Sequence, residues 1–182
     1  MTADRPKSEP NQGIKKPNPV EKDFQMRIDK DGQWFHEEGV IKRPALVKLF
    51  SSVLSCDADG QHWLRTPVEF GRIEVEDAAF VITKAERQGT GKAAKIYLSD
   101  NIERVHLLSP ETPLVFRKSP IKPYGLQPYL LIDKGLSAKI SRPVYYQMAD
   151  FISEEGGISE EDGAGIWSDG VYFAFPIEDE DV

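Results

Sequence analysis

Short apolar segments separated by polar and turn residues recur along the chain, and where apolar and polar residues alternate the pattern is typical of half-exposed β-strands. Ile73 and Val75, for example, alternate with Glu74 and Glu76. The pattern predicts strands near residues 26–28, 33–35, 40–41, 62–64, 73–76, 79–83, 95–98, 105–108, 114–116, 129–132, 136–140, 165–167 and 171–175.

Two segments instead place apolar residues at helical spacing. One starts at Pro44 and is predicted to end near Ser55 or Cys56, and the other runs from Pro143 to about Ile152. Proline suits the first turn of a helix, where its missing N–H group has no partner to lose. Because predicted strands outnumber helices, we expect an α+β fold with mainly antiparallel sheets.

A nine-residue segment that begins Ile-x-Arg-Pro occurs twice, at 41–49 and 140–148. Leu49 and Met148 hold the same place in the two copies, and we predict that both are buried on the apolar faces of their helices. An Ile-Asp-Lys sequence with a nearby glycine precedes each copy, and an Asp-Gly turn before an aromatic strand follows it. We interpret the repeat as a duplicated unit of β-hairpin and helix. The interface between the two units is the best candidate for a functional site.

The chain divides into three parts by composition. Residues 1–24 are rich in proline and charge and contain almost no large apolar residue, so we predict a flexible tail. Residues 25–75 are predicted to form an N-terminal α+β repeat unit, and residues 76–182 a C-terminal α+β domain.

Overall composition excludes several classes of partner. The formal net charge is −7, which argues against binding to a nucleic acid polymer. No run approaches the roughly 18 apolar residues of a membrane helix, so no membrane partner is expected. Cys56 is the single cysteine, which excludes an internal disulfide and a cysteine-rich zinc site. A cytoplasmic location is the resulting expectation.

The short motifs in the chain do not support a catalytic or cofactor site. Residues 89–92 read Gly-Thr-Gly-Lys, but Glu86 and Ala93 replace the glycine and hydroxyl residue that a phosphate-binding loop requires. The sequence lacks a Gly-x-Ser-x-Gly elbow, and its three histidines are far apart along the chain. We therefore predict no metal, no cofactor and no catalytic residue.

The repeated arginines, Arg43 and Arg142, each stand directly before a helix that opens with proline. The first N–H groups of a helix are unpaired and attract anions, and a guanidinium group binds phosphate or carboxylate through two parallel hydrogen bonds. We expect both arginines to face one cleft between the units. The alternative is that each arginine pairs with an acidic residue of its own sheet and only clamps the fold.

Aromatic residues near these arginines offer rings that can stack on a flat ligand, although we expect most of them to belong to the core. These residues are Trp34, Trp63, Tyr145 and Tyr146. The candidate ligand-binding residues are Arg43, Arg142, Trp34, Lys48 and Tyr145.

Several stretches together resemble a bacterial family known as domain of unknown function 1285. The similarity covers about residues 26–150, and Ala79 departs from it where proline is expected. It rests on Asp31-Gly32-Gln33-Trp34, Ile41-x-Arg43, Leu46-Val47-Lys48-Leu49-Phe50, Asp59-Gly60, Trp63-Leu64, Thr66-Pro67-Val68-Glu69, Val75-Glu76-Asp77-Ala78 and Gly135-Leu136-x-Ala138-x-Ile140-x-Arg142-Pro143-Val144-Tyr145.

The resemblance implies a duplicated α+β core whose C-terminal half is pleckstrin-homology-like. It also implies a site for a nucleotide-like molecule between the halves and a role in signalling. Three hypotheses follow: a non-catalytic sensor or adaptor that binds a small anionic ligand, an enzyme that acts on such a ligand, or a protein-binding module that uses a sheet edge. The missing catalytic motifs favour the first.

Overall fold

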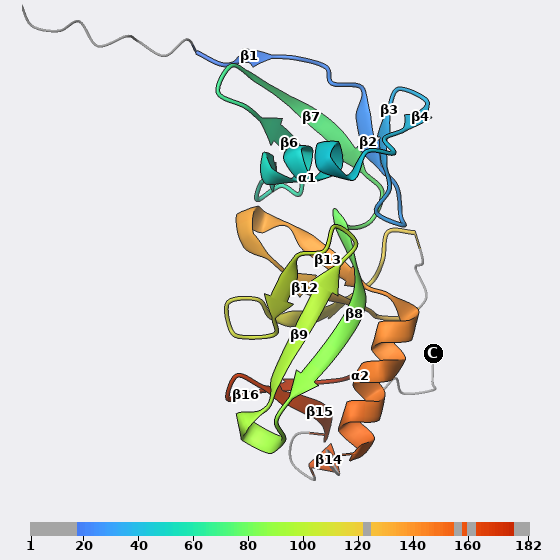
Figure 1. Cartoon of the computed structure of the whole chain (residues 1–182), viewed down its shortest axis with the longest axis vertical. Helices are drawn as coiled ribbons and strands as arrows, with labels where there is room; N and C mark the ends of the chain where they lie inside the picture. The colour runs from blue at the N-terminus through green and yellow to red at the C-terminus, as the bar shows by residue number, and fades with distance from the viewer. Residues whose placement is uncertain (1–17, 122–124, 155–157, 160–162, 177–182) are drawn as a thin grey trace, which may run out of the picture.

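The computed structural model describes residues 18–121, 125–154, 158–159 and 163–176. These residues form two halves stacked along the long axis of the molecule (Figure 1). The N-terminal half contains β1 (Val20–Glu21), β2 (Met26–Ile28), β3 (Trp34–His36), β4 (Gly39–Val40), α1 (Pro44–Ser52), β5 (Leu54–Cys56), β6 (His62–Arg65) and β7 (Glu69–Val75).

The C-terminal half holds a second large sheet, a longer helix and a small three-stranded sheet. Its elements are β8 (Phe80–Gln88), η1 (Gly91–Ala93), β9 (Lys95–Asp100), β10 (Val105–Leu107), β11 (Leu114–Arg117), β12 (Gln127–Leu131), η2 (Asp133–Gly135), β13 (Ser137–Ile140), α2 (Arg142–Glu154), β14 (Ile158–Ser159), β15 (Gly163–Ser168) and β16 (Val171–Ala174). The predicted α+β class with mostly antiparallel sheets is confirmed. Neither helix in the described part of the chain is long and apolar enough to cross a membrane.

The two large sheets share one strand order. If β2–β7 and β8–β13 are each numbered one to six, both sheets read 3-2-1-6-5-4, with strands 1 and 6 as a central parallel pair. The pair joins Ile28 to Val75 in the first half and Ile82 to Ile140 in the second. In the first half, β1 adds a further strand beside β7. The halves are therefore duplicates in sheet topology.

The helices occupy different places in this shared plan. α1 lies between the third and fourth strands of its half, whereas α2 follows the sixth strand, β13. The Ile-x-Arg-Pro segments at 41–44 and 140–143 therefore lie at the starts of helices that are not equivalent in topology. The sequence repeat corresponds to a recurring order of hairpin, helix and hairpin. Its two copies do not fall at equivalent positions of the two duplicated sheets.

Three hairpin turns use the same local chemistry. Asp29 accepts hydrogen bonds of 2.9 Å at Oδ1 from the N–H groups of Asp31 and Gln33. Asp57 and Asp100 bind the turns after β5 and β9 in the same way. The third residue after each aspartate has a positive φ, which glycine adopts without strain; these residues are Gly32, Gly60 and Glu103.

The first helix is shorter than predicted. It ends at Ser52, and Leu54–Cys56 form β5 instead of a last helical turn. Leu54 pairs with Leu64 of β6, and both side chains are buried. Burial of this pair in a sheet outweighs the helical spacing of the local sequence, as tertiary packing often does.

The prediction that Leu49 is buried was wrong, because the side chain is 57% exposed. Val47, Phe50 and Ser51 lie toward the core at the i, i+3, i+4 spacing of one helix face. The apolar residues between positions 46 and 54 fit two faces about equally, so periodicity alone did not select the right one. Met148 of α2 is fully buried, as predicted.

Part of the predicted tail belongs to the folded structure. Val20 and Glu21 pair with Glu69 and Phe70 of β7, and Phe24 packs against the core. Val20, Glu21 and Phe24 of the segment 1–24 are thus part of the fold, held by a strand pairing and by one aromatic side chain. Residues 1–17 lie outside the described residues.

The halves meet through a continuous hydrophobic core and several polar contacts. Asn101 donates a hydrogen bond of 3.0 Å to the carbonyl of Gly32. Lys134 donates one of 2.6 Å to the carbonyl of Ser52, at the C-terminal end of α1. Cations favour the carbonyl end of a helix, so Lys134 caps α1 from the opposite half.

Candidate functional site

A cavity of about 790 Å³ opens at the junction of the halves. The N-terminal half contributes Lys30 and Asp31 from the turn between β2 and β3. The described residues that the C-terminal half contributes are Asp77, Val81, Ser119, Ile121, Leu126, Gln127, Pro128, Lys139, Ile140, Ser141, Arg142, Tyr145 and Tyr146. Both halves are needed to form the cavity, which lies where the duplication predicts a site.

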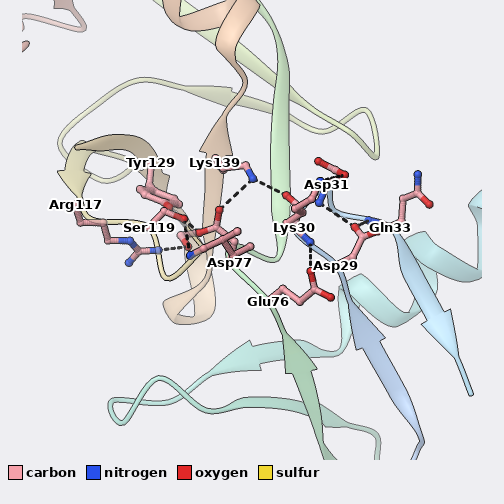
Figure 2. A network of polar contacts seen from close by, with 12 residues as sticks. Asp29, Lys30, Asp31, Gln33, Glu76, Asp77, Arg117, Ser119, Tyr129 and Lys139 are labelled. Carbon is pink, nitrogen blue, oxygen red and sulfur yellow. Dashed lines mark hydrogen bonds and ion pairs between the residues drawn. The ribbon is translucent and has the colours of Figure 1, made fainter. Parts of the chain in front are cut away.

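The carboxylate of Asp77 in the cavity wall is almost completely buried, with a side chain that is 2% exposed. It accepts a hydrogen bond of 2.6 Å from the hydroxyl of Tyr129 and lies 3.1 Å from Nζ of Lys139. Lys139 also donates to the carbonyl of Lys30, as Figure 2 shows. Burial and the adjacent Asp77 raise the pKa of Tyr129, so this hydroxyl keeps its proton and donates.

Lys30 lies at the edge of this network. Its ammonium group is 2.6 Å from Oδ2 of Asp31, and its N–H group donates to Glu76 (Figure 2). The hydrogen bond and negative charge of Asp31 raise the pKa of Lys30, which therefore stays protonated. Lys30 and Lys139 thus each have a carboxylate partner within the wall.

Arg142 differs from these two lysines. It is exposed at the first position of α2, and within the described part of the chain its guanidinium group forms no ion pair or hydrogen bond. The first backbone hydrogen bond of α2 runs from the N–H group of Tyr145 to the carbonyl of Ser141, so the N–H groups before Tyr145 have no partner within the helix. An unpaired cation and a positive helix end therefore lie together at the cavity wall.

A second, smaller groove of about 400 Å³ contains two other candidate residues, Trp34 and Lys48. The indole ring of Trp34 is 1% exposed and stacks on Phe50, with ring centroids 6.1 Å apart. Lys48 forms an ion pair of 2.6 Å with Glu103 of the opposite half. Trp34 thus belongs to the core, and Lys48 bridges the halves.

Arg43 contributes to the wall of neither hollow, so the structure does not bring the two repeated arginines into one cavity. It precedes α1 and is exposed, and it has no ion-pair partner among the residues that the structure describes. The clamp alternative therefore has no acidic partner at Arg43 or Arg142 in this part of the chain. Of the five candidates, Arg142 and Tyr145 line the large cavity.

The sequence analysis did not select most of the charged residues of the wall: Lys30, Asp31, Asp77 and Lys139. Lys30 was visible in the repeated Ile-Asp-Lys segment, which was interpreted only as a sign of duplication. Asp77 and Lys139 carried no local signal, because their pairing depends on two segments 62 residues apart in the chain.

Comparison with known proteins gives a consistent family relationship. Models of the DUF1285 domain of unknown function match residues 14–78 with their N-terminal domain and residues 79–175 with their C-terminal domain. A crystal structure of a DUF1285 family protein from Silicibacter pomeroyi DSS-3 is 32% identical, with a TM-score of 0.75 over 92% of this chain and 88% of that one. Another, from Shewanella baltica OS155, is 27% identical, with a TM-score of 0.56 over 69% and 91%. No curated protein matches the chain.

Proposed function

The chain is a member of the DUF1285 family, and on that premise we propose that it is a non-catalytic sensor or adaptor. In this proposal it binds a small anionic, nucleotide-like ligand in the cavity between its halves. The observation that carries the proposal is the unpaired guanidinium group of Arg142 on the wall of a cavity to which both halves contribute. A cavity of about 790 Å³ lies within the usual range for small-molecule sites.

The position of the cavity supports a sensing role. A ligand that contacts Lys30 or Asp31 on one side and Arg142 on the other is bound by both halves at once. Such a ligand stabilises the arrangement of the halves that fits it, and this differential stabilisation is the physical basis of a signal. We place the function in signal transduction for this reason.

In this proposal the buried carboxylate of the cavity stabilises the fold and does not react with the ligand. Asp77 binds Tyr129 and Lys139, which holds β12 and β13 against the start of the C-terminal half. The proposal accordingly contains no chemical step.

Two further expectations belong to the same proposal. The C-terminal half is pleckstrin-homology-like, an assignment supported by a mostly antiparallel sheet followed by a helix that packs on β8. The protein acts in the cytoplasm, an assignment supported by the single cysteine of the chain.

Native mass spectrometry of the full-length protein, purified without added ligand, tests the proposal. We expect an additional mass of a small anion that is released unchanged on denaturation. The variant Arg142→Ala should lose this mass, and Arg43→Ala should keep it. Release of a chemically altered molecule after incubation would instead support the enzyme hypothesis. If every variant carries no small molecule and none of the anions tested afterwards binds, the proposal is wrong.

A further inference from the structure

The charge and the apolar rim of the cavity define the ligand more narrowly than its location does. We infer that the site takes a molecule with a single negative charge on a flat apolar body, such as a phosphodiester or a carboxylate joined to a ring system. This inference rests on the proposed function, because it concerns the same cavity. It excludes di- and triphosphates as the preferred ligands.

Most of the charged groups of the cavity wall are paired with one another. Among the residues that the structure describes, three cations line the cavity, Lys30, Lys139 and Arg142, together with two carboxylates, Asp31 and Asp77. Each lysine lies within 3.1 Å of one of these carboxylates. Within this described set, Arg142 is the cation without a carboxylate partner, and its charge matches one negative charge on a ligand.

Additional negative charges on a ligand would lie beside wall residues that are already paired. A triphosphate bound to Arg142 must place its other phosphates elsewhere along the wall, where Lys30 and Lys139 are already neutralised by their partners. Binding there requires breaking an ion pair or approaching the carboxylates of Asp31 and Asp77. Like charges brought together in a partly enclosed site repel each other strongly, so the site selects against high charge.

The cavity also has an apolar rim. Three large apolar side chains that are exposed to solvent, Ile121, Leu126 and Tyr146, line this one cavity. Tyr146 is 56% exposed, and its ring contacts that of Tyr145 at a centroid distance of 6.1 Å. Exposed apolar groups gathered at a cavity mark a binding surface, and an aromatic face favours a flat partner.

A series of adenosine and guanosine nucleotides of different charge, together with one flat carboxylate, tests the inference. Isothermal titration of the full-length protein would compare the cyclic monophosphate, the monophosphate and the triphosphate of adenosine and of guanosine, together with naphthoate as a flat carboxylate. We expect the cyclic monophosphate or the carboxylate to bind at least about tenfold more tightly than the triphosphate. The same titrations distinguish the two anionic groups. Tighter binding of the cyclic nucleotide identifies a phosphodiester, and tighter binding of naphthoate identifies a carboxylate.

Two outcomes would overturn the inference, and they have different consequences. Tighter binding of the triphosphates would disprove the single-charge rule and leave the proposed function intact. Absence of binding for every member of the series would count against both the inference and the proposed function.

A matched pair of variants tests the apolar body separately. Tyr146→Ala should weaken binding of the preferred ligand at least about fivefold, because it removes the exposed aromatic face. Leu49→Ala is the control, since Leu49 is 57% exposed on the other helix and lines neither hollow. Equal affinity in Tyr146→Ala and the wild type would show that the rim does not contact the ligand and would overturn this part of the inference.

Discussion

Nζ of Lys139 lies 3.1 Å from Oδ2 of Asp77, although neither residue stands in a recognisable motif. The side chains are 20% and 2% exposed, so this ion pair is largely withdrawn from water. It joins the segment after β7 to β13 and forms the polar base of the cavity between the halves.

Asp77→Ala is predicted to lower the free energy of unfolding by about 3–5 kcal/mol, because it leaves the ammonium group of Lys139 without a counter-ion near the protein interior. The hydroxyl of Tyr129 loses its acceptor as well. Urea denaturation measures the loss. The double variant with Lys139→Met should recover part of it, and a double variant that is less stable than Asp77→Ala would contradict the account.

The two helices should respond differently to truncation at equivalent positions of the sequence repeat. Met148→Ala should cost about 2–5 kcal/mol, since it leaves a cavity in the core. Leu49→Ala should change stability by no more than about 0.5 kcal/mol, since its side chain is mostly in water. Thermal melts of both variants provide the comparison, and equal losses would show that α1 buries the other face.

Acid should destabilise the protein partly through Asp100. Burial alone would raise the pKa of this carboxyl group, but hydrogen bonds from His106 and Arg104 outweigh it and hold the pKa below its ordinary value. A lowered pKa in the folded state stabilises the protein above the unfolded value of about 3.9, and this stabilisation is lost as the pH falls below it.

Melting temperatures of the wild type and Asp100→Asn between pH 7 and pH 2.5 test this effect. The difference between the two proteins should be constant near neutral pH and shrink below about pH 4. A constant difference down to pH 2.5 would mean that Asp100 has an ordinary pKa.

Gly135 should be intolerant of substitution because of the contact between the halves. Its φ is +71°, and an added Cβ would overlap the carbonyl of Cys56 in β5. Gly135→Ala should therefore lower the melting temperature, whereas Gly60→Ala controls for φ alone, since its φ is +81° with open space around it. Equal effects of the two substitutions would show that the contact with Cys56 is unimportant.

Local patterns predicted the hairpins, both helix starts and the α+β class, because alternation and turn chemistry act over a few residues. The β2–β3 hairpin, for example, follows from Asp29 and Gly32 alone. Patterns of this range did not reveal that Leu54 leaves the helix to pair with Leu64, or which face of α1 is buried.

The candidate site was also predicted only in part, because local sequence patterns extend over only a few residues. Arg142 was found because it lies at the start of a helix, beside a proline that is visible in the sequence. The same rule selected Arg43, but α1 lies at a different place in the shared sheet topology, and its first turn does not line the large cavity. Lys139 and Asp77 meet only through the parallel pairing of β8 and β13, which a single sequence does not specify.

The central claim is that a small anion binds between the halves through Arg142. Isothermal titration with cyclic and open monophosphates of adenosine and guanosine, on the wild type, Arg142→Ala and Arg43→Ala, tests it most directly. We expect Arg142→Ala to weaken binding at least about tenfold, Arg43→Ala to bind like the wild type, and all three proteins to melt at the same temperature. Equal binding by Arg142→Ala and the wild type, or a loss confined to Arg43→Ala, would contradict it.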